Sequence, residues 1–343
     1  RAAGFRAIVL AAEGMRSDLS ALAEEFGATL VTDEQPAQGP AAAIAAGLAA
    51  AETEWSLVLS ADMPFYDFEL VRALLPEAAG ETQIVLPTLL GYWQPLAALY
   101  RRDTGATFAA AIARGDRKLG IILRELAMRE LPLTADAGLF FNVNTPAALR
   151  LARGRAANLV RRVPIVSIVA PASGTGKTTF VEKLLPLLTA RGVRVGVVKS
   201  DAHGIVLNDG TKDSGRFRAA CALSVAVVAP AGFWLYERTQ ERLSLEAAAA
   251  RMTGVDLVLI ETRSHGVFPA FSLWRGLEEP LLDERVAALF SSCHERQAEG
   301  ILQLDLEAME DAARLTIFLM GREEGFDLHR IAWDGGHSGK GGA

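Results

Sequence analysis

Residues 169–179, VAPASGTGKTT, constrain the fold of this chain more than any other stretch. An apolar run, PIVSIVAP (164–171), precedes the glycines, and a helical pattern, TTFVEKLLPLL (178–188), follows them, which predicts a strand, a tight loop and a helix. Gly174 and Gly176 let the backbone curl, and the unpaired N–H groups at a helix start favour anions. The stretch therefore predicts a phosphate-binding loop.

Two side chains of this loop carry specific roles. Lys177 is expected to reach the terminal phosphates, and the hydroxyl of Thr178 suits Mg²⁺. Pro171 stands where the usual pattern has glycine, and it has no N–H to donate. A chance turn without a ligand is the alternative, against which the flanking strand and helix argue. The expected nucleotide-binding residues of the loop are Ser173, Gly174, Thr175, Gly176, Lys177, Thr178 and Thr179.

Charged residues end two further strands of the second half. The run DLVLIE (256–261) ends in Glu261, and VRVGVVKSD (193–201) ends in Lys199 and Asp201. Ligands of open parallel sheets bind at the carboxyl ends of strands, so all three are expected near the loop. We expect Glu261 to hold a metal-bound water or to orient an attacking one, as a metal and catalytic residue, and Lys199 and Asp201 to contact nucleotide. An exposed strand-end acid remains the alternative for Glu261.

Two histidines follow these acids closely, His203 and His265. A lone histidine is more often a polar packing residue than a ligand, and both readings stay open.

Short apolar runs alternate with amphipathic stretches along nearly the whole chain, which is long enough, at 343 residues, for two domains. This order predicts α/β architecture with mostly parallel sheets covered on both faces, as two doubly wound domains. Expected strands are 7–12, 29–33, 56–64 and 83–87, then 164–171, 193–201, 224–230 and 256–261; expected helices of the first half are 18–26, 41–52 and 68–78.

The segment 150–162, RLARGRAANLVRR, contains five arginines and lacks a strand pattern, so we expect the domain boundary there. A solvated helix end or linker is the preferred interpretation, and contact with a polyanion is the alternative. The predicted domains are 1–155 and 163–322, followed by a flexible tail, 323–343.

Composition excludes some classes of partner. A net charge of −6 argues against a general nucleic-acid binder, and no apolar run reaches the ~18 residues of a membrane span. Cys221 and Cys293 are far apart and lack metal-ligand spacing. They are expected to be reduced thiols of a cytoplasmic protein.

The first half has its own strand-end residues. Asp62 ends SLVLSADMP (56–64), where Pro64 fixes the turn, and a carboxylate at this edge suits Mg²⁺. Asp33 ends the preceding strand. Asn142 and Asn144 lie in NVNTP (142–146), which supplies amide groups before a helix, although Asn144-Thr145-Pro146 also makes a simple helix cap.

The second half resembles the molybdopterin-guanine dinucleotide biosynthesis adapter protein family (MobB), over about 163–320. The resemblance lies in the phosphate loop, VVKSDAHG (197–204), TKDSGRFRAA (211–220), LVLIE (257–261) and a closing helix, 302–320. It implies a P-loop NTPase domain that binds GTP with Mg²⁺ and hydrolyses GTP poorly. This chain departs from the family at Pro171, at Cys221 and at 262–264, TRS, where the family shows Gly-x-Lys. Arg263 and Arg275 are the candidates for the missing positive charge.

The first half resembles the molybdenum cofactor guanylyltransferase family (MobA), a nucleotidyltransferase with a Rossmann-like domain. Four pieces occur in the family's order: VTDEQPAQGP (31–40), SADMP (60–64), GYWQPLAALY (91–100) and FFNVNTPAAL (140–149). The resemblance implies attack by the terminal phosphate of molybdopterin on the α-phosphorus of GTP, which expels pyrophosphate. It also implies that Asp62 binds Mg²⁺ in catalysis, that Asp33 lies beside the guanine nucleotide, and that Asn142 and Asn144 seat the pterin.

The guanylyltransferase family begins with a strand and a glycine-rich loop that hold the triphosphate through an Arg and a Lys. This chain begins at what resembles the second strand, FRAIVLAAE (5–13), and has Ala where the family motif Gly-Pro-Leu-x-Gly has Leu and Gly (39–43). We therefore expect the chain as given to be a poor guanylyltransferase, and the full-length gene product to encode the missing unit.

The leading hypothesis is a bifunctional protein of molybdenum cofactor maturation, a transferase followed by a GTP-binding adapter. The alternatives are a non-catalytic GTP-dependent adapter and a P-loop ligase or synthase of the cobyrinate type, whose loops APASGTGKT (170–178) also resembles. Expected partners are GTP and molybdopterin or molybdenum cofactor, with insertion proteins and molybdoenzymes as further candidates. No Asn-Lys-x-Asp box is present, so the choice of guanine over cytosine rests on the resemblance alone.

Overall fold

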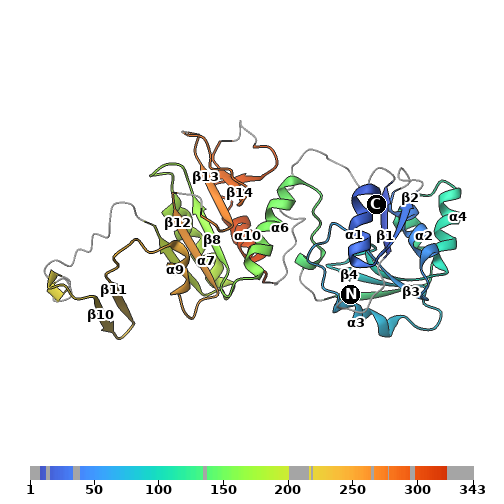
Figure 1. Cartoon of the computed structure of the whole chain (residues 1–343), viewed down its shortest axis with the longest axis horizontal. Coiled ribbons are helices and arrows are strands. Elements are labelled where there is room, and N and C mark those ends of the chain that lie inside the picture. Colours follow the sequence, from blue (N-terminus) through green and yellow to red (C-terminus); the bar gives the residue numbers. More distant parts are fainter. Residues whose placement is uncertain are drawn as a thin grey trace. The chain divides into compact units, whose positions relative to one another are not determined.

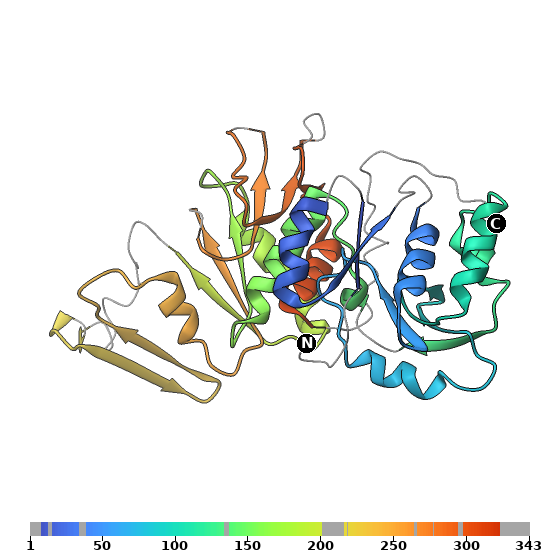
Figure 2. The same ribbon diagram turned by 45° about the vertical axis from the view of Figure 1, so that its right-hand side comes forward.

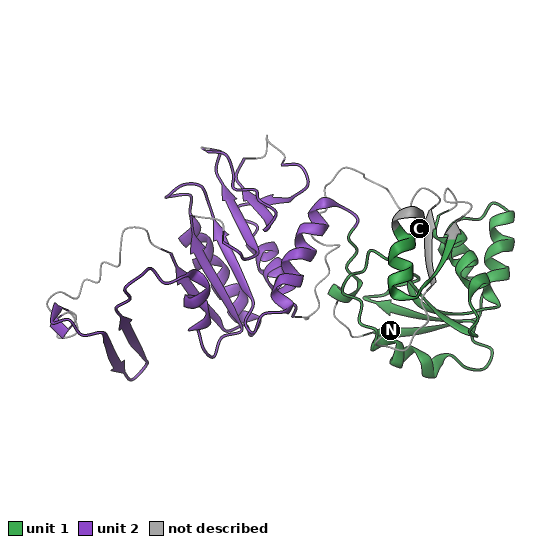
Figure 3. Ribbon diagram, viewed as in Figure 1, with its two compact units in different colours: residues 1–143, 323–326 green, residues 144–322, 327–343 purple. Residues whose placement is uncertain are grey.

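The computed structural model describes residues 8–12, 16–33, 39–133, 137–200, 216–217, 219–263, 266–276, 278–293 and 298–322, with backbone only for 8–12, 16–18, 32–33 and 137. Contacts among these residues divide the chain into two compact units between Val143 and Asn144 (Figures 1 and 3). The α/β class is confirmed in both units. In the described part of the chain, no helix is both long and apolar enough to cross a membrane.

The first unit opens with two strand–helix pairs. Strands β1 (Ile8–Ala12) and β2 (Thr29–Asp33) pair in parallel, with helix α1 (Arg16–Phe26) between them. Helix α2 (Pro40–Ala50) follows β2 and begins at Gly39, whose φ of 72° suits a residue without Cβ. Its Ala-rich sequence allows close packing, and Ala41, Ile44 and Leu48 are buried.

A five-stranded mixed sheet completes the first unit. It contains β3 (Trp55–Leu59), β4 (Ile84–Leu89), β5 (Tyr92–Trp93), β6 (Ala97–Arg101) and β7 (Met128–Leu133). The prediction of a mostly parallel sheet is wrong here, since β6 pairs antiparallel with both β3 and β4. The reason is the connection: only the short β5 hairpin lies between β4 and β6, and a parallel pairing needs a long crossover.

Helices cover this sheet and bury apolar residues on both faces. Helices α4 (Thr104–Ala113) and α5 (Leu119–Leu123) pack on the side of Leu86, Tyr100 and Phe108. Helix α3 (Leu70–Leu74), the 3-10 helix η3 (Leu75–Glu77) and the 3-10 helix η4 (Ala137–Phe140) belong to the other side, where Val85 and Leu99 are buried.

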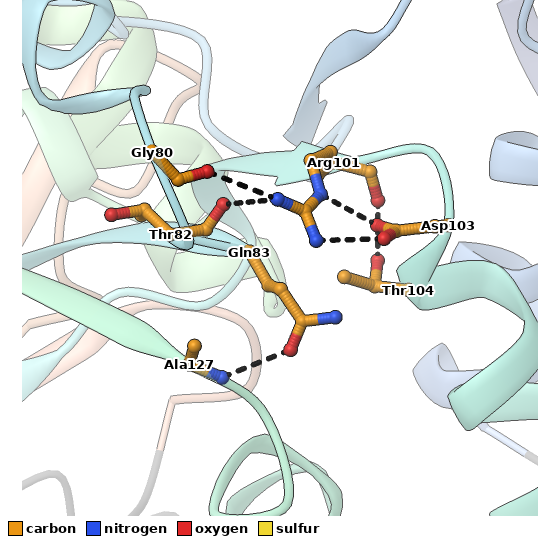
Figure 4. A network of polar contacts seen from close by, with 7 residues as sticks. All are labelled: Gly80, Thr82, Gln83, Arg101, Asp103, Thr104 and Ala127. Carbon is orange, nitrogen blue, oxygen red and sulfur yellow. Dashed lines mark hydrogen bonds and ion pairs between the residues drawn. The ribbon is translucent and has the colours of Figure 1, made fainter.

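A network of hydrogen bonds links the chain segments at one end of strands β4 and β6 (Figure 4). Arg101, at the end of β6, donates from Nε and Nη2 to the carboxylate of Asp103 at 2.9 and 2.7 Å. Its Nη1 donates to the carbonyl oxygen of Thr82 at 3.1 Å, just before β4. The hydrogen bond from Arg101 lowers the pKa of Asp103. The network thereby ties the entry of β4 to the exit of β6 and the start of α4.

The second unit begins with helix α6 (Pro146–Leu159), capped by Thr145, whose hydroxyl accepts the N–H of Ala148 at 3.1 Å. The sequence placed much of this helix in the first domain or in a solvated linker, but two of its polar residues are buried. Arg155 donates to the carbonyl oxygen of Phe318 at 2.9 Å, and Asn158 bonds Leu319 and Ile165. The segment 150–162 therefore packs against the second unit through some of its polar residues. The boundary between the two units lies before this helix, between Val143 and Asn144.

A six-stranded, wholly parallel sheet forms the centre of the second unit, in the order β15-β14-β13-β8-β12-β9. The strands are β8 (Ile165–Val169), β9 (Val195–Lys199), β12 (Leu257–Thr262), β13 (Ala270–Trp274), β14 (Val286–Ser291) and β15 (Leu302–Asp305). Helices α7 (Lys177–Ala190) and α10 (Met309–Met320) pack together, and Phe180 of α7 packs against Phe290 of strand β14. Helix α9 (Leu245–Ala250) buries Ala249 against Val258 and Ile260.

Two expectations for this unit are corrected. Residues 224–230 do not join the main sheet: β10 (Ser224–Ala229) and β11 (Gly232–Glu237) form an antiparallel hairpin, because a two-residue turn folds the chain straight back (Figures 1 and 2). Residues 302–320 are not one helix, since β15 occupies the first four and α10 starts at Met309.

Candidate functional site

The phosphate-loop segment has the predicted strand–loop–helix geometry. Strand β8 ends at Val169, and α7 starts at Lys177 after an N-cap, Gly176, in the left-handed region with φ 100°. Gly174 also has a positive φ, 75°. Both conformations favour glycine, so the two glycines shape the loop as the sequence indicates. Helix α7 runs for 14 residues, and its first N–H groups have no partner inside the helix.

Two side chains of the loop bond back onto its own backbone. Lys177 is 7% exposed, and its Nζ donates to the carbonyl oxygen of Ala172 at 2.9 Å. The hydroxyl of Thr175 donates to the same oxygen, also at 2.9 Å. Burial lowers the pKa of Lys177; the charge of Glu261 opposes that shift, and the charges of Arg263 and Lys199 add to it. A buried cation thus lies inside the loop, where an anionic ligand would compensate its desolvation.

The strand-end acid Glu261 comes next to this loop, as predicted. The hydroxyl of Thr178 donates to its two carboxylate oxygens at 2.9 and 3.0 Å. Lys199, paired in register with Glu261 on the neighbouring strand β9, places its Nζ 3.6 Å from Oε1. The parallel register of β8, β9 and β12 accounts for this meeting, because their carboxyl ends share one edge of the sheet.

Arg275 also meets the loop, and it is the better placed of the two arginines considered from the sequence. It follows β13, and its Nε donates to the carbonyl oxygen of Thr175 at 2.8 Å. Arg263 acts on Lys177 through its charge. Residues 171–175, Trp274, Arg275 and Glu278 line a small cavity beside the loop. The sequence did not predict this flank of the loop, because the apolar run 270–274 was not recognised as a strand.

A residue that was missed from the sequence is Arg242, whose Nη2 donates to the hydroxyl of Ser200 at 2.8 Å. Ser200 in turn donates its N–H to the carbonyl oxygen of Glu261 at 2.8 Å. Arg242 lies between β11 and α9, in a stretch without any motif, so no signal in one sequence could have assigned it.

In the first unit, Asp62 lies in the turn after β3. Its carbonyl oxygen accepts a hydrogen bond from the N–H of Val143 at 2.8 Å, so residues 140–143 lie beside the turn that follows β3. One carboxylate oxygen, Oδ1, is buried without a hydrogen-bond partner among the described residues. Buried carboxylate oxygens are normally paired, so this atom marks a position suited to a cation.

The other expected residues are placed as follows. Asn142 is exposed and adjoins Val143 in the first unit, whereas Asn144 is exposed and is the first residue of the second unit. Asp33 is the last residue of β2, and its side chain is not among those described. Asp201, His203, His265 and the tail 323–343 lie outside the described residues.

Mg²⁺ fits the donors that are present. No cluster of three or more His, Cys, Asp or Glu side chains suited to a metal occurs within the described ranges. Mg²⁺ does not need such a cluster, since it takes one or two carboxylates, waters and substrate phosphates. Thr178 with Glu261 in the second unit and Asp62 in the first supply oxygen donors of this kind.

Comparison with known proteins matches each half to a different family. Residues 165–292 match the model described as molybdopterin guanine dinucleotide synthesis protein B, and residues 1–130 match a MobA-like NTP transferase domain. The molybdopterin-guanine dinucleotide biosynthesis adapter protein of Escherichia coli (strain K12) is 31% identical over 172 residues, which are 48% of this chain and 97% of that protein. A probable molybdenum cofactor guanylyltransferase of Natronomonas pharaonis is 33% identical over 145 residues, 40% of this chain and 70% of that protein.

The chain belongs to both of these families. The resemblances to MobA and MobB stated from the sequence are confirmed, in the predicted order along the chain. The matches do not favour the cobyrinate-type synthase or the purely non-catalytic adapter. Among solved structures, molybdopterin-guanine dinucleotide biosynthesis protein A of Archaeoglobus fulgidus is 25% identical with a TM-score of 0.38, covering 45% of this chain and 80% of that one.

Proposed function

We propose that this chain acts in the biosynthesis of molybdopterin guanine dinucleotide. Its first unit transfers GMP from GTP to molybdopterin, and its second unit binds GTP with Mg²⁺ as an adapter. Membership of the MobA-like and MobB families supports both parts. The observation that carries the second part is the meeting of Thr178 and Glu261 at the start of α7, beside the buried Lys177.

In the second unit, the loop amides of 173–177 and the N-terminus of α7 bind the triphosphate, and Lys177 leaves the Ala172 carbonyl to contact it. Thr178 and Glu261 hold Mg²⁺, which offsets phosphate charge when bound. Lys199 lies on the other side of Glu261 and adds positive charge beside the phosphates. The second unit is a slow GTPase in this proposal, with Glu261 orienting water.

In the first unit, Asp62 holds Mg²⁺ through the buried Oδ1, and Asp33 lies beside the guanine nucleotide. Asn142, which belongs to this unit, contacts the pterin. The molybdopterin phosphate displaces pyrophosphate from GTP, a step that depends on positioning and electrostatic stabilisation. Insertion proteins or molybdoenzymes would receive the product. Cys221 and Cys293 are free thiols, the form that the cytoplasm maintains, and we propose that compartment.

The transfer step is tested by incubating the whole chain with molybdopterin, Mg²⁺ and GTP labelled at the α-phosphate. Because Ala41 and Ala43 replace the Leu and Gly of the family motif, only slow labelling of the dinucleotide is expected. Asp62→Asn should abolish it, while Lys177→Ala and the surface control Glu69→Gln should retain it. Transfer that survives Asp62→Asn would contradict the role given to the first unit.

A further inference from the structure

Arg275 holds one peptide group of the phosphate loop. It extends from the end of β13 to the loop, where its Nε donates to the carbonyl oxygen of Thr175 at 2.8 Å. The guanidinium also lies close to the next residue: a Cβ placed on Gly176 would be 3.2 Å from its Nη2. Arg275 therefore covers the side of the Thr175–Gly176 peptide on which the carbonyl lies.

The direction of this carbonyl fixes the direction of an N–H group. No peptide bond among the described residues is cis, and in a planar trans peptide the C=O and the following N–H point in opposite directions. A bond from Arg275 to the Thr175 oxygen thus directs the N–H of Gly176 away from Arg275. That N–H precedes the first residue of α7, at the helix end that favours anions. A charged donor on the oxygen also polarises the amide and strengthens its N–H as a donor.

This peptide needs such a restraint. Gly176 has a φ of 100°, and Gly174 has a φ of 75° on the other side of Thr175. Glycine populates positive and negative φ about equally, so the peptides beside it reorient more easily than others. With the Thr175–Gly176 peptide turned over, a carbonyl oxygen would face the phosphate, and like partial charges would oppose binding.

We propose that Arg275 is a positioning residue for nucleotide binding, which keeps the Gly176 N–H directed at the bound phosphate. The inference rests on the proposed binding of GTP by the second unit. It assigns the positive charge beside this loop a role through the backbone, separate from the direct phosphate contact proposed for Lys177.

Arg263 is the matched control, since it has the same side chain and follows Thr262, the last residue of β12, the strand on the other side of β8 from β13. It is exposed and acts on Lys177 by charge, lowering the pKa of Lys177 as a lesser cause after burial. Loss of Arg263 removes a charge near the loop, whereas loss of Arg275 removes a charge and also the restraint on the Thr175 carbonyl.

The test compares the whole chain with Arg275→Met, Arg275→Lys and Arg263→Met. Calorimetry with GTP and with GDP, both with Mg²⁺, should show that Arg275→Met weakens the two ligands by a similar factor, about 10-fold. Arg275→Lys should regain part of the loss, and Arg263→Met should change affinity by less than about 3-fold. In a ¹⁵N–¹H correlation spectrum, the downfield shift of the Gly176 amide on GDP binding should disappear in Arg275→Met. The thermal unfolding temperature should stay unchanged, because Arg275 is exposed.

The inference is overturned if Arg275→Met binds both nucleotides like wild type, or if the Gly176 amide keeps its shift. It is also overturned if only GTP binding weakens, since that result assigns Arg275 a direct contact with the terminal phosphate. Should Arg275→Met unfold, the same comparison is made with Arg275→Lys, which keeps the charge. Absence of nucleotide binding to the folded wild-type chain would instead refute the proposed function itself.

Discussion

The hydroxyl of Thr178 lies 2.9 and 3.0 Å from the two carboxylate oxygens of Glu261, although 83 positions separate them in the chain. Thr178 is in the first turn of α7, and Glu261 is in β12, whose register with β8 sets their approach. Two oxygen donors at the N-terminus of a helix, beside a buried lysine, form a site suited to a cation bound to phosphate.

Removal of either oxygen donor should make nucleotide binding less dependent on magnesium. Thr178→Val keeps the side-chain shape without the hydroxyl, and Glu261→Gln removes the charge. For each, the gain in GTP affinity that Mg²⁺ provides should fall by about 10-fold, because one ligand of a hard cation is lost.

The measurement is calorimetric titration with GTP in Mg²⁺ and in EDTA. Thr178→Ser and Glu278→Gln are the controls, since the first keeps the hydroxyl and the second alters an acid beside the cavity on the other flank of the loop. An undiminished magnesium effect in both Thr178→Val and Glu261→Gln would contradict this account of the site.

Helix α6 should prove essential to the stability of the second unit. Asn158 is 1% exposed; its side chain bonds the N–H and C=O of Ile165 at 3.0 and 3.1 Å and the carbonyl of Leu319 at 3.0 Å. Asn158→Ala leaves these groups buried without a partner and should lower the free energy of unfolding by about 3 kcal/mol.

Arg153→Ala, on the exposed side of the same helix, is the control and should cost less than about 0.5 kcal/mol. Hydrogen exchange of peptides from β8 and α10 measures the stability of the second unit separately from that of the first. Equal protection in Asn158→Ala and wild type would show that α6 does not stabilise the second unit.

Acid should weaken the β9–β12 edge of the second unit. Hydrogen bonds from Arg194, and then from Arg322, lower the pKa of Asp256 well below its ordinary value. A carboxyl with a lowered folded-state pKa adds stability that is complete above its unfolded pKa, about 3.9, and is lost as pH falls towards the folded value.

Asp256→Asn should therefore lower the free energy of unfolding by about 1 kcal/mol at pH 7. The difference from wild type should become smaller below about pH 4. The measurement is the free energy of unfolding in urea across this pH range, with hydrogen exchange of peptides from β9 and β12 as the readout for this part of the second unit. Glu284→Gln, which alters a looser exposed pair with Arg153 at 3.9 Å, should show almost no effect. A penalty for Asp256→Asn that stays constant down to pH 3 would contradict the assigned role.

The site residues that could be predicted from the sequence are those whose place in the fold follows from the local sequence pattern. The loop around Lys177 and the strand end at Glu261 follow from apolar runs, glycine and the edge rule for parallel sheets, and the structure brings these two residues together. The contact between Arg275 and Thr175 was beyond reach, because it depends on β13 being a strand next to β8. One apolar run of five residues does not reveal its neighbour.

Polar residues in the interior produced the largest error. Arg155 and Asn158 have the composition of a solvated segment, yet both are buried against α10 and bond its carbonyl groups. Periodicity cannot show that a partner lies more than a hundred residues away. The β10–β11 hairpin misled for the opposite reason: its apolar residues, such as Val228 and Phe233, are exposed, although their pattern is typical of a buried strand.

The central claim is that the loop amides and Lys177 of the second unit bind a magnesium–GTP complex. The most direct measurement is calorimetry of GTP with Mg²⁺ on the Asp62→Asn chain, which removes the metal ligand proposed for the first unit, and on the Asp62→Asn, Lys177→Ala double variant. The account predicts clear binding to the first and an affinity lower by at least about 10-fold in the second. Equal heats from both folded proteins, or none from the first, would contradict it.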